Sequence, residues 1–354
     1  MINNIVTQDM EDIYSGDVLW EKLNGKTILL TGAYGMLASY LVYFLVYIRN
    51  QKNVNVNLIA VVRDRNKFFS KFSNIGVLDN VTVIENDISK PLDISEQIDY
   101  IIHAASLASP QYYGICPVDV LMPNTIGTYY LLQLARRKKV KSFLLFSTCD
   151  VYGEPNTING MITETAYGKM DTLDIHNCYS ESKRMAETMC KAFNVQYGVP
   201  TKIARIAHTY APTMDIDDDP RVFASFVKDI VSGHDIVMKS DGMSKRSFCY
   251  ITDAIVGYFT ILFKGIDGEA YNVCNTSQFV SIKELAEILV SIYPEKKLKV
   301  VQKERQKSEH YIENNLLVGC DCIPDNSKLM RLGWNAKVDI KTGFKRVIDI
   351  IGNV

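Results

Sequence analysis

The sequence has no excess of charge of either sign and no long apolar run. Its 354 residues include 39 Lys and Arg against 40 Asp and Glu, which gives a formal net charge of −1. This near-neutrality argues against a nucleic acid or a polybasic membrane contact as the main partner. The longest strongly apolar stretch, Met36–Ile48, is too short to span a bilayer, and residues 1–17 are too polar and acidic for a secretory signal. We therefore expect a cytoplasmic protein with no membrane partner.

The eight cysteines form no Cys-x-x-Cys pair. A chain of 354 residues can bury a sizeable core and needs no disulfide staples. Cys320 and Cys322 lie close together in the sequence, but without a neighbouring histidine they do not resemble metal ligands. The sequence therefore predicts reduced thiols throughout and no metal site.

Apolar strands alternate with amphipathic helices from Gly25 onward. This alternation predicts βαβ units, and therefore a parallel sheet with helices on both faces, in a Rossmann-type, doubly wound α/β fold. The expected strands are Lys26–Thr31, Asn57–Val62, Val81–Glu85, Tyr100–Ala104, Ser142–Ser147 and Thr201–Ile206. The expected helices are Met36–Arg49, Pro123–Lys138 and Tyr179–Tyr197.

A glycine-containing turn follows the first expected strand and opens a helix. In Thr31–Ala38, Gly32 and Gly35 permit a tight turn and the close approach of a pyrophosphate, while Tyr34 and Met36 complete the loop. The helix N-terminus then offers free N–H groups and a positive dipole end to the phosphates. This strand–turn–helix context predicts dinucleotide binding.

The ends of the next two strands carry residues that could contact the adenosine. Arg63 after the second strand suits the 2′-phosphate of NADP, whereas Asp64 could hold the ribose diol of NAD. Asp87 and Ile88 after the third strand could bind the adenine edge, although capping the next turn explains Asp87 equally well. We expect NAD, with NADP left open by Arg63.

The pattern of predicted secondary structure changes after about residue 210. Strands become shorter, turn signals become more frequent, and Ser281–Ile292 begins with a capping-box pattern. We therefore expect an acidic helical extension over 1–24, an NAD(P)-binding Rossmann domain over 25–210, and a smaller C-terminal α/β substrate lobe. This lobe covers mainly 211–354 and is interleaved with the first domain.

A possible catalytic group lies at the carboxyl end of the fifth strand. Thr148 ends that strand, and Tyr179 and Lys183 are spaced by four on a following helix, which places them on one face. A phenol is a poor base at neutral pH, but a Lys ammonium one turn away and a positive nicotinamide stabilise its phenolate. Tyr179 could then remove an alcohol proton, with Thr148 donating to the same substrate oxygen.

These motifs together resemble the extended short-chain dehydrogenase/reductase family of nucleotide-sugar epimerases, dehydratases and decarboxylases. The resemblance runs from about Gly25 to Ile350. It implies a tightly held nicotinamide cofactor and a nucleoside-diphosphate sugar as substrate. It also implies a homodimer built through a four-helix bundle of helices 123–138 and 179–197. Further matches that support it are His103–Ser106, Asn124 with Gly127–Thr128, Ser147–Gly153, Arg246 before Phe248, and Leu332–Trp334.

The resemblance assigns roles to several residues. Cofactor contacts fall on Ala104, Ala105, Ser106, Asn124 and Lys183. Substrate contacts fall on Ser106, His208, Arg221 and Arg246, because a guanidinium fork suits a diphosphate. His103 is more plausible as a satisfied structural histidine than as a catalytic one. Asp217–Asp219 resembles a metal cluster only superficially, and an exposed acidic turn is the preferred interpretation.

The sequence is most similar to UDP-glucuronate decarboxylases within this family. The similarity rests on His103–Pro110 followed by Tyr112-Tyr113, on Arg184–Cys190 and on Asp219–Val222. The motif after the fifth strand departs from it: Thr148-Cys149-Asp150 stands where decarboxylases have Thr-Ser-Glu and dTDP-glucose 4,6-dehydratases have Thr-Asp-Glu. A thiol cannot easily replace the second dehydratase acid, so dehydration is disfavoured, and the shorter Asp150 puts its reach to the sugar in doubt.

Three other positions depart from the decarboxylase pattern. His208 and Thr213 stand where decarboxylases have Asn and Arg, and Ile323 stands where they have Arg. These changes suggest a sugar or a nucleotide other than UDP-glucuronate.

The resulting hypothesis is an NAD(P)-dependent enzyme that works through a 4-keto nucleotide sugar. Tyr179 removes the C4′ hydroxyl proton, Thr148 orients the oxygen, Lys183 holds the cofactor ribose, and Asp150 assists proton delivery. A 4-epimerase or a 4,6-dehydratase is the alternative within the family. A non-catalytic, NAD(P)-sensing binding protein is the alternative from another class.

Overall fold

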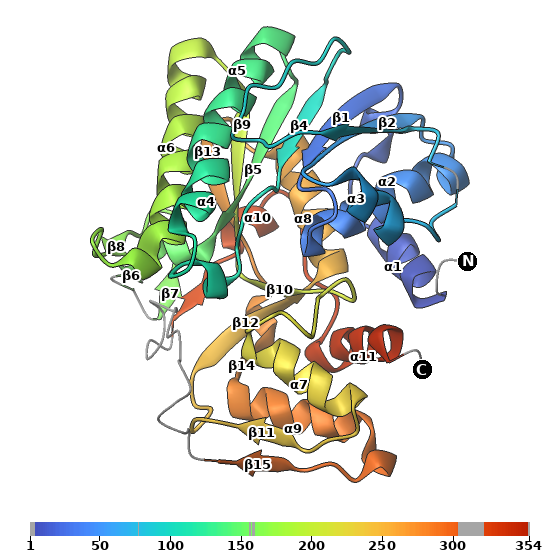
Figure 1. Ribbon diagram of the computed structural model, residues 1–354, viewed down its shortest axis with the longest axis vertical. Helices are drawn as coiled ribbons and strands as arrows, with labels where there is room; N and C mark the ends of the chain where they lie inside the picture. The colour runs from blue at the N-terminus through green and yellow to red at the C-terminus, as the bar shows by residue number, and fades with distance from the viewer. Residues whose placement is uncertain (1–3, 77, 156, 158–159, 304–321, 353–354) are drawn as a thin grey trace.

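The computed structural model describes residues 4–76, 78–155, 157, 160–303 and 322–352 (Figure 1). At its centre is a parallel sheet of seven strands. In spatial order these are β13 (Glu269–Val273), β9 (Thr201–Ile206), β5 (Ser142–Thr148), β4 (Tyr100–His103), β1 (Lys26–Thr31), β2 (Val56–Val62) and β3 (Val81–Glu85). The order reverses beside β1, and the predicted Rossmann-type sheet is confirmed.

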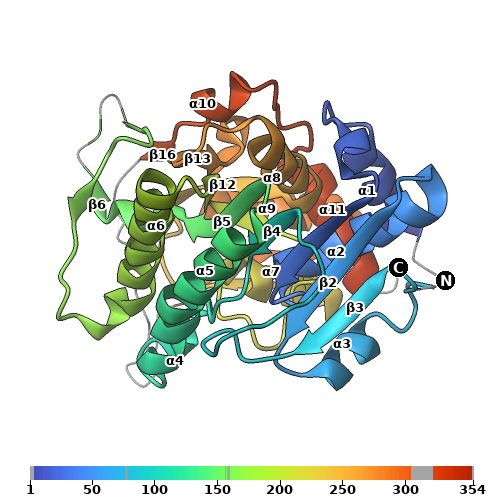
Figure 2. The ribbon, with the colours of Figure 1, turned by 90° about the horizontal axis from the view of Figure 1, so that it is seen from above.

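Helices cover both faces of this sheet (Figure 2). On one side lie α2 (Met36–Lys52) and α8 (Ile251–Lys264), and on the other α5 (Thr128–Lys138) and α6 (Cys178–Tyr197). The alternation of side chains along each strand explains the two layers. Leu29 packs in the cluster that holds helix residues of α5 and α6, whereas Ile28 and Leu30 pack in the cluster that holds α2 and α8.

A smaller unit lies below the sheet in Figure 1. It contains the three-stranded sheet β10–β12–β14 and the pair β11–β15, with helices α7, α9 and α11. The predicted capping box of α9 is present, because Ser281 and Glu284 each bond to the other's backbone N–H. The bounds are β10 (His208–Tyr210), β11 (Ile236–Met238), β12 (Lys245–Tyr250), β14 (Phe279–Ser281), β15 (Val300–Gln302), α7 (Val222–Val231), α9 (Ile282–Ile292) and α11 (Ile340–Ile351).

The chain passes repeatedly between these two units. Strand β13 and helix α8 lie beyond residue 210 in the sequence but complete the central sheet and one of its layers. The segment after β5 pairs with the C-terminal part through β7 (Met161–Ile162) and β16 (Ile323–Pro324). The other short elements are β6 (Glu154–Pro155), β8 (Gly168–Lys169), α1 (Asn4–Tyr14), α3 (Arg65–Lys71), α4 (Pro117–Met122) and α10 (Ser327–Met330). The short helical turns are η1 (Trp20–Leu23), η2 (Pro110–Tyr112), η3 (Pro123–Gly127), η4 (Cys149–Tyr152), η5 (Ile175–Asn177), η6 (Thr276–Gln278) and η7 (Pro294–Lys296).

The structure corrects two of the expectations. The helix predicted over Pro123–Lys138 is not one α-helix, because Pro123 lacks the N–H of a regular turn and a π-helical turn, η3, separates α4 from α5. The prediction of reduced thiols throughout is also wrong, since Cys322 takes part in a disulfide. Cys116, Cys149, Cys178, Cys190, Cys249 and Cys274 are free, and Cys320 lies outside the described residues.

Among the residues that the structure describes, no helix is both long and apolar enough to cross a bilayer.

Candidate active site

The turn between β1 and α2 has the geometry expected of a phosphate loop. Gly32 has a φ of +67°, and a Cβ at this position would lie 2.8 Å from the Cα of Ala105. A Cβ on Gly35 would lie 3.2 Å from the carbonyl oxygen of Gly32. The loop therefore requires glycine at position 32, whereas at position 35 a side chain would only be tightly packed. Tyr34 lies in this loop, between the two glycines, and Met36 is the first residue of the 17-residue helix α2.

His103 joins the end of β4 to this loop. The Oγ1 of Thr31 accepts hydrogen bonds from the N–H groups of Ala104 and Ala105, at 3.1 and 3.0 Å, so its own proton is donated to Nδ1 of His103, 2.9 Å away. Nε2 of His103 must then carry the ring proton, and it lies 3.2 Å from the carbonyl oxygen of Pro123. Burial and the charge of Lys183 lower the His103 pKa to about 3. His103 is thus neutral and fully partnered, in agreement with the structural role expected for it.

Of the eight buried side-chain polar atoms without a hydrogen-bond partner in the described structure, three lie at the carboxyl ends of two strands and in η3. They are Oδ1 of Asn86, Oγ of Ser106 and Oδ1 of Asn124. Buried polar groups are normally paired, and a ligand bound at this edge of the sheet would supply partners for these three atoms. The glycine loop, the helix N-terminus and these atoms fit a dinucleotide.

The residues at the ends of β2 and β3 also make contacts within the protein. Asp64 caps α3 by accepting a bond from the N–H of Lys67 at 2.9 Å, and Asp87 accepts one from the N–H of Ser89 at 2.9 Å. The capping contact expected as the alternative for Asp87 is thus present, and it uses one of the two carboxylate oxygens. Ile88 is buried in the core between sheet and helices, and Arg63 is exposed at the end of β2.

Thr148, Asp150 and Tyr179 come together at the carboxyl end of β5. The Oγ1 of Thr148 accepts a bond from the N–H of Asp150 at 3.2 Å, and the Thr148 side chain also bonds to the Tyr179 phenol. Burial, followed by the charge of Asp150, raises the pKa of Tyr179, while Thr148 and Arg221 lower it. Burial also raises the pKa of Asp150, against the opposing effects of Thr148 and Arg246. The three side chains therefore form one electrostatically linked group.

Lys183 lies beneath Tyr179 on the same face of α6. Its side chain is 2% exposed, its Nζ donates to the carbonyl oxygen of Phe146 at 2.7 Å, and it lies 5.8 Å from the centroid of the Tyr179 ring. Burial lowers the Lys183 pKa to about 7, with Glu187 acting in the opposite direction. The Tyr179 ring also stacks on Tyr113, with centroids 5.4 Å apart. The Tyr–Lys face is therefore present and tightly packed, but the expected stabilisation of the phenolate by Lys183 is not seen, because only Thr148 and Arg221 lower the Tyr179 pKa.

A partly buried ion pair holds α6 against the sheet below Lys183. Glu187 lies one helical turn beyond Lys183 and accepts a bond from the Ser147 hydroxyl at 2.6 Å. The guanidinium of Arg205, on β9, donates two hydrogen bonds to the Glu187 carboxylate, from Nη2 at 2.7 Å and from Nε at 3.0 Å. Sequence reasoning missed this support for Lys183, although Glu187 lies within the Arg184–Cys190 match.

Cys149 points away from the Thr148–Tyr179 group. Its Sγ lies 3.6 Å from the carbonyl oxygen of Arg205, and the side chain packs in a small cluster with Tyr152 and Ile162. Burial and the neighbouring Asp150 raise the pKa of the thiol. A neutral thiol in this position cannot provide a second acid for the sugar, which supports the argument against dehydration.

Three predicted substrate residues approach the group from the smaller unit. Arg246, on β12, is nearly buried and close enough to lower the pKa of Asp150. Arg221 lowers the pKa of Tyr179. Its Nε donates to both carboxylate oxygens of Asp219, at 2.9 and 3.0 Å. Burial and these two arginines lower the His208 pKa to about 3. The structure thus brings together His208, Arg221 and Arg246 with Asp150 and Tyr179.

The loop that approaches α2 from the smaller unit was not expected to contact the phosphate loop. Thr213 donates its hydroxyl to the carbonyl oxygen of Met36 at 2.7 Å, and Nη2 of Arg221 lies 3.4 Å from the Met36 sulfur. Lys71 of α3 donates to the carbonyl oxygen of Tyr34 at 3.1 Å. No sequence signal marks Lys71. Thr213 was visible only as a departure from the decarboxylase pattern.

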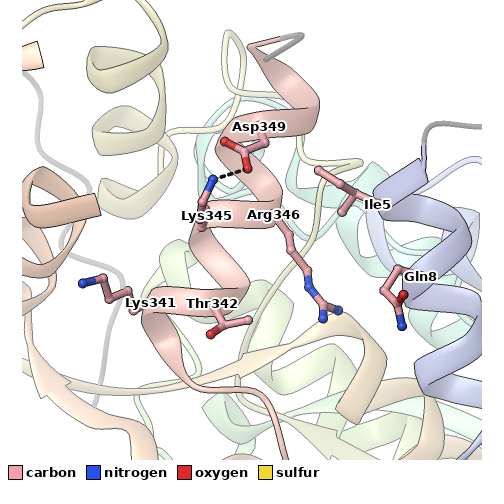
Figure 3. A pocket seen from close by; sticks show the side chains of 7 residues that line it. All are labelled: Ile5, Gln8, Lys341, Thr342, Lys345, Arg346 and Asp349. Carbon is pink, nitrogen blue, oxygen red and sulfur yellow. Dashed lines mark hydrogen bonds and ion pairs between the residues drawn. The ribbon is translucent and has the colours of Figure 1, made fainter. Parts of the chain in front are cut away.

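An open pocket of about 390 Å³ lies elsewhere, between α1 and α11 (Figure 3). It is lined by Ile5, Gln8, Lys341, Thr342, Lys345, Arg346 and Asp349, and none of the predicted site residues belongs to it.

Comparisons with known proteins agree with this geometry. The model of the NAD dependent epimerase/dehydratase family matches residues 28–274. UDP-glucuronic acid decarboxylase 6 of Arabidopsis thaliana is 33% identical over 90% of this chain and 86% of its own length. UDP-glucuronic acid decarboxylase 1 of Danio rerio is 31% identical over 91% of this chain and 72% of its own length.

Solved structures share the fold. UDP-glucuronic acid 4-epimerase from Bacillus cereus, in complex with UDP-glucuronic acid and NAD, aligns with a TM-score of 0.74 and 21% identity, covering 92% of this chain and 99% of that one. UDP-glucose 4-epimerase from Thermotoga maritima, with UDP-glucose, aligns with a TM-score of 0.74 and 23% identity, covering 92% and 98%. At this identity they support the architecture alone.

The chain belongs to the NAD dependent epimerase/dehydratase family. Its membership confirms the family resemblance drawn from the motifs, and with it the expectation of an NAD-dependent enzyme.

Proposed function

We propose that the protein removes the carboxyl group of a nucleoside-diphosphate uronic acid through transient oxidation at C4′, as a UDP-glucuronate decarboxylase does. The observation that carries the proposal is that, among the described residues of the strand-end motif 148–150, one carboxylate, Asp150, lies beside Thr148 and Tyr179, with Cys149 turned away from them. One acid–base residue next to the tyrosine suits decarboxylation or epimerisation better than elimination of water. The decarboxylases at 33% and 31% identity favour the first of these.

The dinucleotide would be held by the glycine loop and by the buried polar atoms at the strand ends. Gly32, Tyr34, Gly35 and Met36 would hold the pyrophosphate. Ala104, Ala105, Ser106, Asn124 and Lys183 would line the nicotinamide half, and Arg63, Asp87 and Ile88 the adenosine half. When bound, the nicotinamide accepts the C4′ hydride and returns it. We propose NAD as the cofactor, because the family is NAD dependent.

Different residues of the chain would then carry out the separate proton transfers of the reaction. The Tyr179 phenolate takes the proton of the C4′ hydroxyl, and Thr148 donates a hydrogen bond to the resulting keto oxygen. The 4-keto group accepts the electron pair released when the C5′–carboxyl bond breaks and carbon dioxide leaves. Asp150 assists delivery of a proton to C5′. Arg246 and Arg221 bind the diphosphate, and Ser106 and His208 contact the sugar.

A 4-epimerase is the second candidate. At His208, Thr213 and Ile323 this chain departs from the decarboxylase pattern, which favours a sugar or a nucleotide other than UDP-glucuronate. Epimerisation needs no second acid, and so the position of Cys149 does not count against it.

Incubation with UDP-glucuronate in deuterated water tests both candidates. A decarboxylase yields carbon dioxide and a UDP-pentose that carries deuterium at C5′, whereas a 4-epimerase yields a hexuronate without label at that carbon. The absence of both carbon dioxide and a pentose would reject the decarboxylase. If neither product forms although NAD binds, the chain is better described as an NAD-sensing binding protein.

We also propose a cytoplasmic homodimer. For its domains we propose the division 1–24, 25–210 and mainly 211–354, with the last part interleaved with the second because α8 and β13 join the central sheet. Partly exposed apolar side chains on η3, α5 and α6, namely Ile126, Tyr129 and Met185, support pairing through these helices. The proposed location rests on the six free thiols among the described residues, and the disulfide at Cys322 does not support it. Sedimentation velocity of the purified protein tests the dimer, and a single species of monomer mass would contradict it.

A further inference from the structure

The N-terminal helix α1 carries a carboxylate buried at a junction of four elements. Asp9 is fully buried. Its Oδ2 accepts hydrogen bonds from the phenols of Tyr40, on α2, and Tyr250, at the end of β12, at 2.9 and 2.6 Å. Its Oδ1 accepts a bond from Nη1 of Arg346, on α11, at 2.6 Å. All three donors come from outside α1, so the carboxylate joins elements that are far apart in the sequence.

Each of the two phenols belongs to an element that carries a different part of the candidate active site. Tyr40 is on α2 and Tyr250 is on β12. Tyr40 lies one helical turn, roughly 6 Å, along α2 from Met36, which ends the phosphate loop. Tyr250 lies four residues, roughly 13 Å, along β12 from Arg246 and on the same face of that strand. Tyr250 is also in register with Tyr210 of β10, the strand that begins at His208. Asp9 therefore connects the phosphate loop with both strands that carry substrate residues.

The contacts around Asp9 make this connection stiff. Tyr40 and Tyr250 are fully buried, and Val6, Met10 and Ile13 of α1 lie in the large core cluster. The same guanidinium nitrogen of Arg346 also bonds to Asp12 at 2.7 Å. Figure 3 shows Arg346 reaching from α11 toward α1. Packed side chains in such a cluster transmit a displacement rather than absorbing it.

We propose that Asp9 is a positioning residue, which sets the distance between the dinucleotide loop and the substrate strands through Tyr40 and Tyr250. The proposal rests on the proposed function only for the identity of the nucleotide sugar. Asp9 touches neither ligand, and its effect is on how the two binding sites face each other. Residues 1–24, which carry no catalytic motif, thereby take part in ligand binding.

Binding titrations can separate the effect of the Tyr40 bond from that of the Tyr250 bond, because a variant of either tyrosine removes one hydrogen bond to Asp9. Isothermal titration calorimetry with NAD and with UDP gives each Kd without depending on turnover. We expect Tyr40→Phe to raise the Kd for NAD and Tyr250→Phe to raise the Kd for UDP. Asp9→Asn should raise both, by roughly 3- to 30-fold, the range of coupling through a packed network. Steady-state assays should show a larger change in KM than in kcat.

Glu11→Gln is the matched control, because Glu11 also links α1 to α2 but bonds to Tyr47 and Lys52 at the far end of that helix. It should leave both Kd values unchanged. Variants that melt at a lower temperature yet keep wild-type affinities would overturn the proposal and leave Asp9 a purely structural role. If Asp9→Asn does not fold, the two phenylalanine variants decide. Failure of UDP to bind the wild-type protein would contradict the proposed nucleotide instead, and the NAD arm would still decide the role of Asp9.

Discussion

Replacement of Tyr179 by phenylalanine is expected to lower kcat by about 10²- to 10⁴-fold, the usual contribution of a positioned general base. The variant keeps the ring that stacks on Tyr113 and loses only the oxygen that bonds to Thr148. KM and the Kd for NAD should therefore change little. Initial rates on the substrate identified by the deuterium experiment, with NAD affinity by calorimetry, provide the measurement.

Tyr113→Phe is the control for that experiment. It removes a phenol whose hydroxyl donates to the carbonyl oxygen of Ala108, 3.0 Å away, and keeps the stacked ring. Its rate should stay within a few-fold of wild type. A Tyr179→Phe enzyme of nearly full activity would show that another group removes the proton.

The second large effect is expected at Arg246. Arg246→Met should raise KM by about 10- to 100-fold, because the substrate loses a forked, charge-assisted hydrogen-bond donor. The charge of Arg246 also lowers the pKa of Asp150. Its removal leaves the raising effect of burial less opposed, so the limb of the pH profile that Asp150 governs should move to higher pH. Profiles of kcat/KM against pH measure both effects.

Arg246→Lys separates the two contributions. Lysine keeps the positive charge but not the fork, so KM should rise while the Asp150-governed limb stays close to its wild-type position. Equal shifts of that limb in both variants would contradict the electrostatic link between Arg246 and Asp150.

Local patterns predicted the parts of the site that depend on local structure. The turn at Gly32 and Gly35 and the four-residue spacing of Tyr179 and Lys183 each follow from one strand, turn or helix, whose periodicity is visible in the sequence. The strand end at Thr148 follows for the same reason, since carboxyl ends of parallel strands meet at one edge. Six of the seven central strands were predicted to within about one residue at either end, whereas β13 was not predicted, because its residues were assigned to the substrate lobe.

Contacts between distant segments could not be predicted in this way. The bond from Tyr250 to Asp9 spans 241 positions, and that from Arg346 spans 337. The direction of the Cys149 side chain is set by its packing against Tyr152 and Ile162, and nothing in the strand pattern encodes that choice. Likewise, the pairing of Arg221 with Asp219 is an outcome of loop geometry rather than of periodicity.

The position of β13 determines the order in which this protein can fold during synthesis. This edge strand contributes residues 269–273 and pairs with β9, and the preceding helix α8 covers Phe146 of β5 through Tyr258, with ring centroids 4.4 Å apart. A nascent chain that ends near residue 210 has an unpaired strand edge at β9 and an uncovered apolar face on the sheet. Such surfaces favour association with other unfinished chains. The Rossmann half is therefore completed only after residues 251–273 of the second half, which form α8 and β13, have been translated.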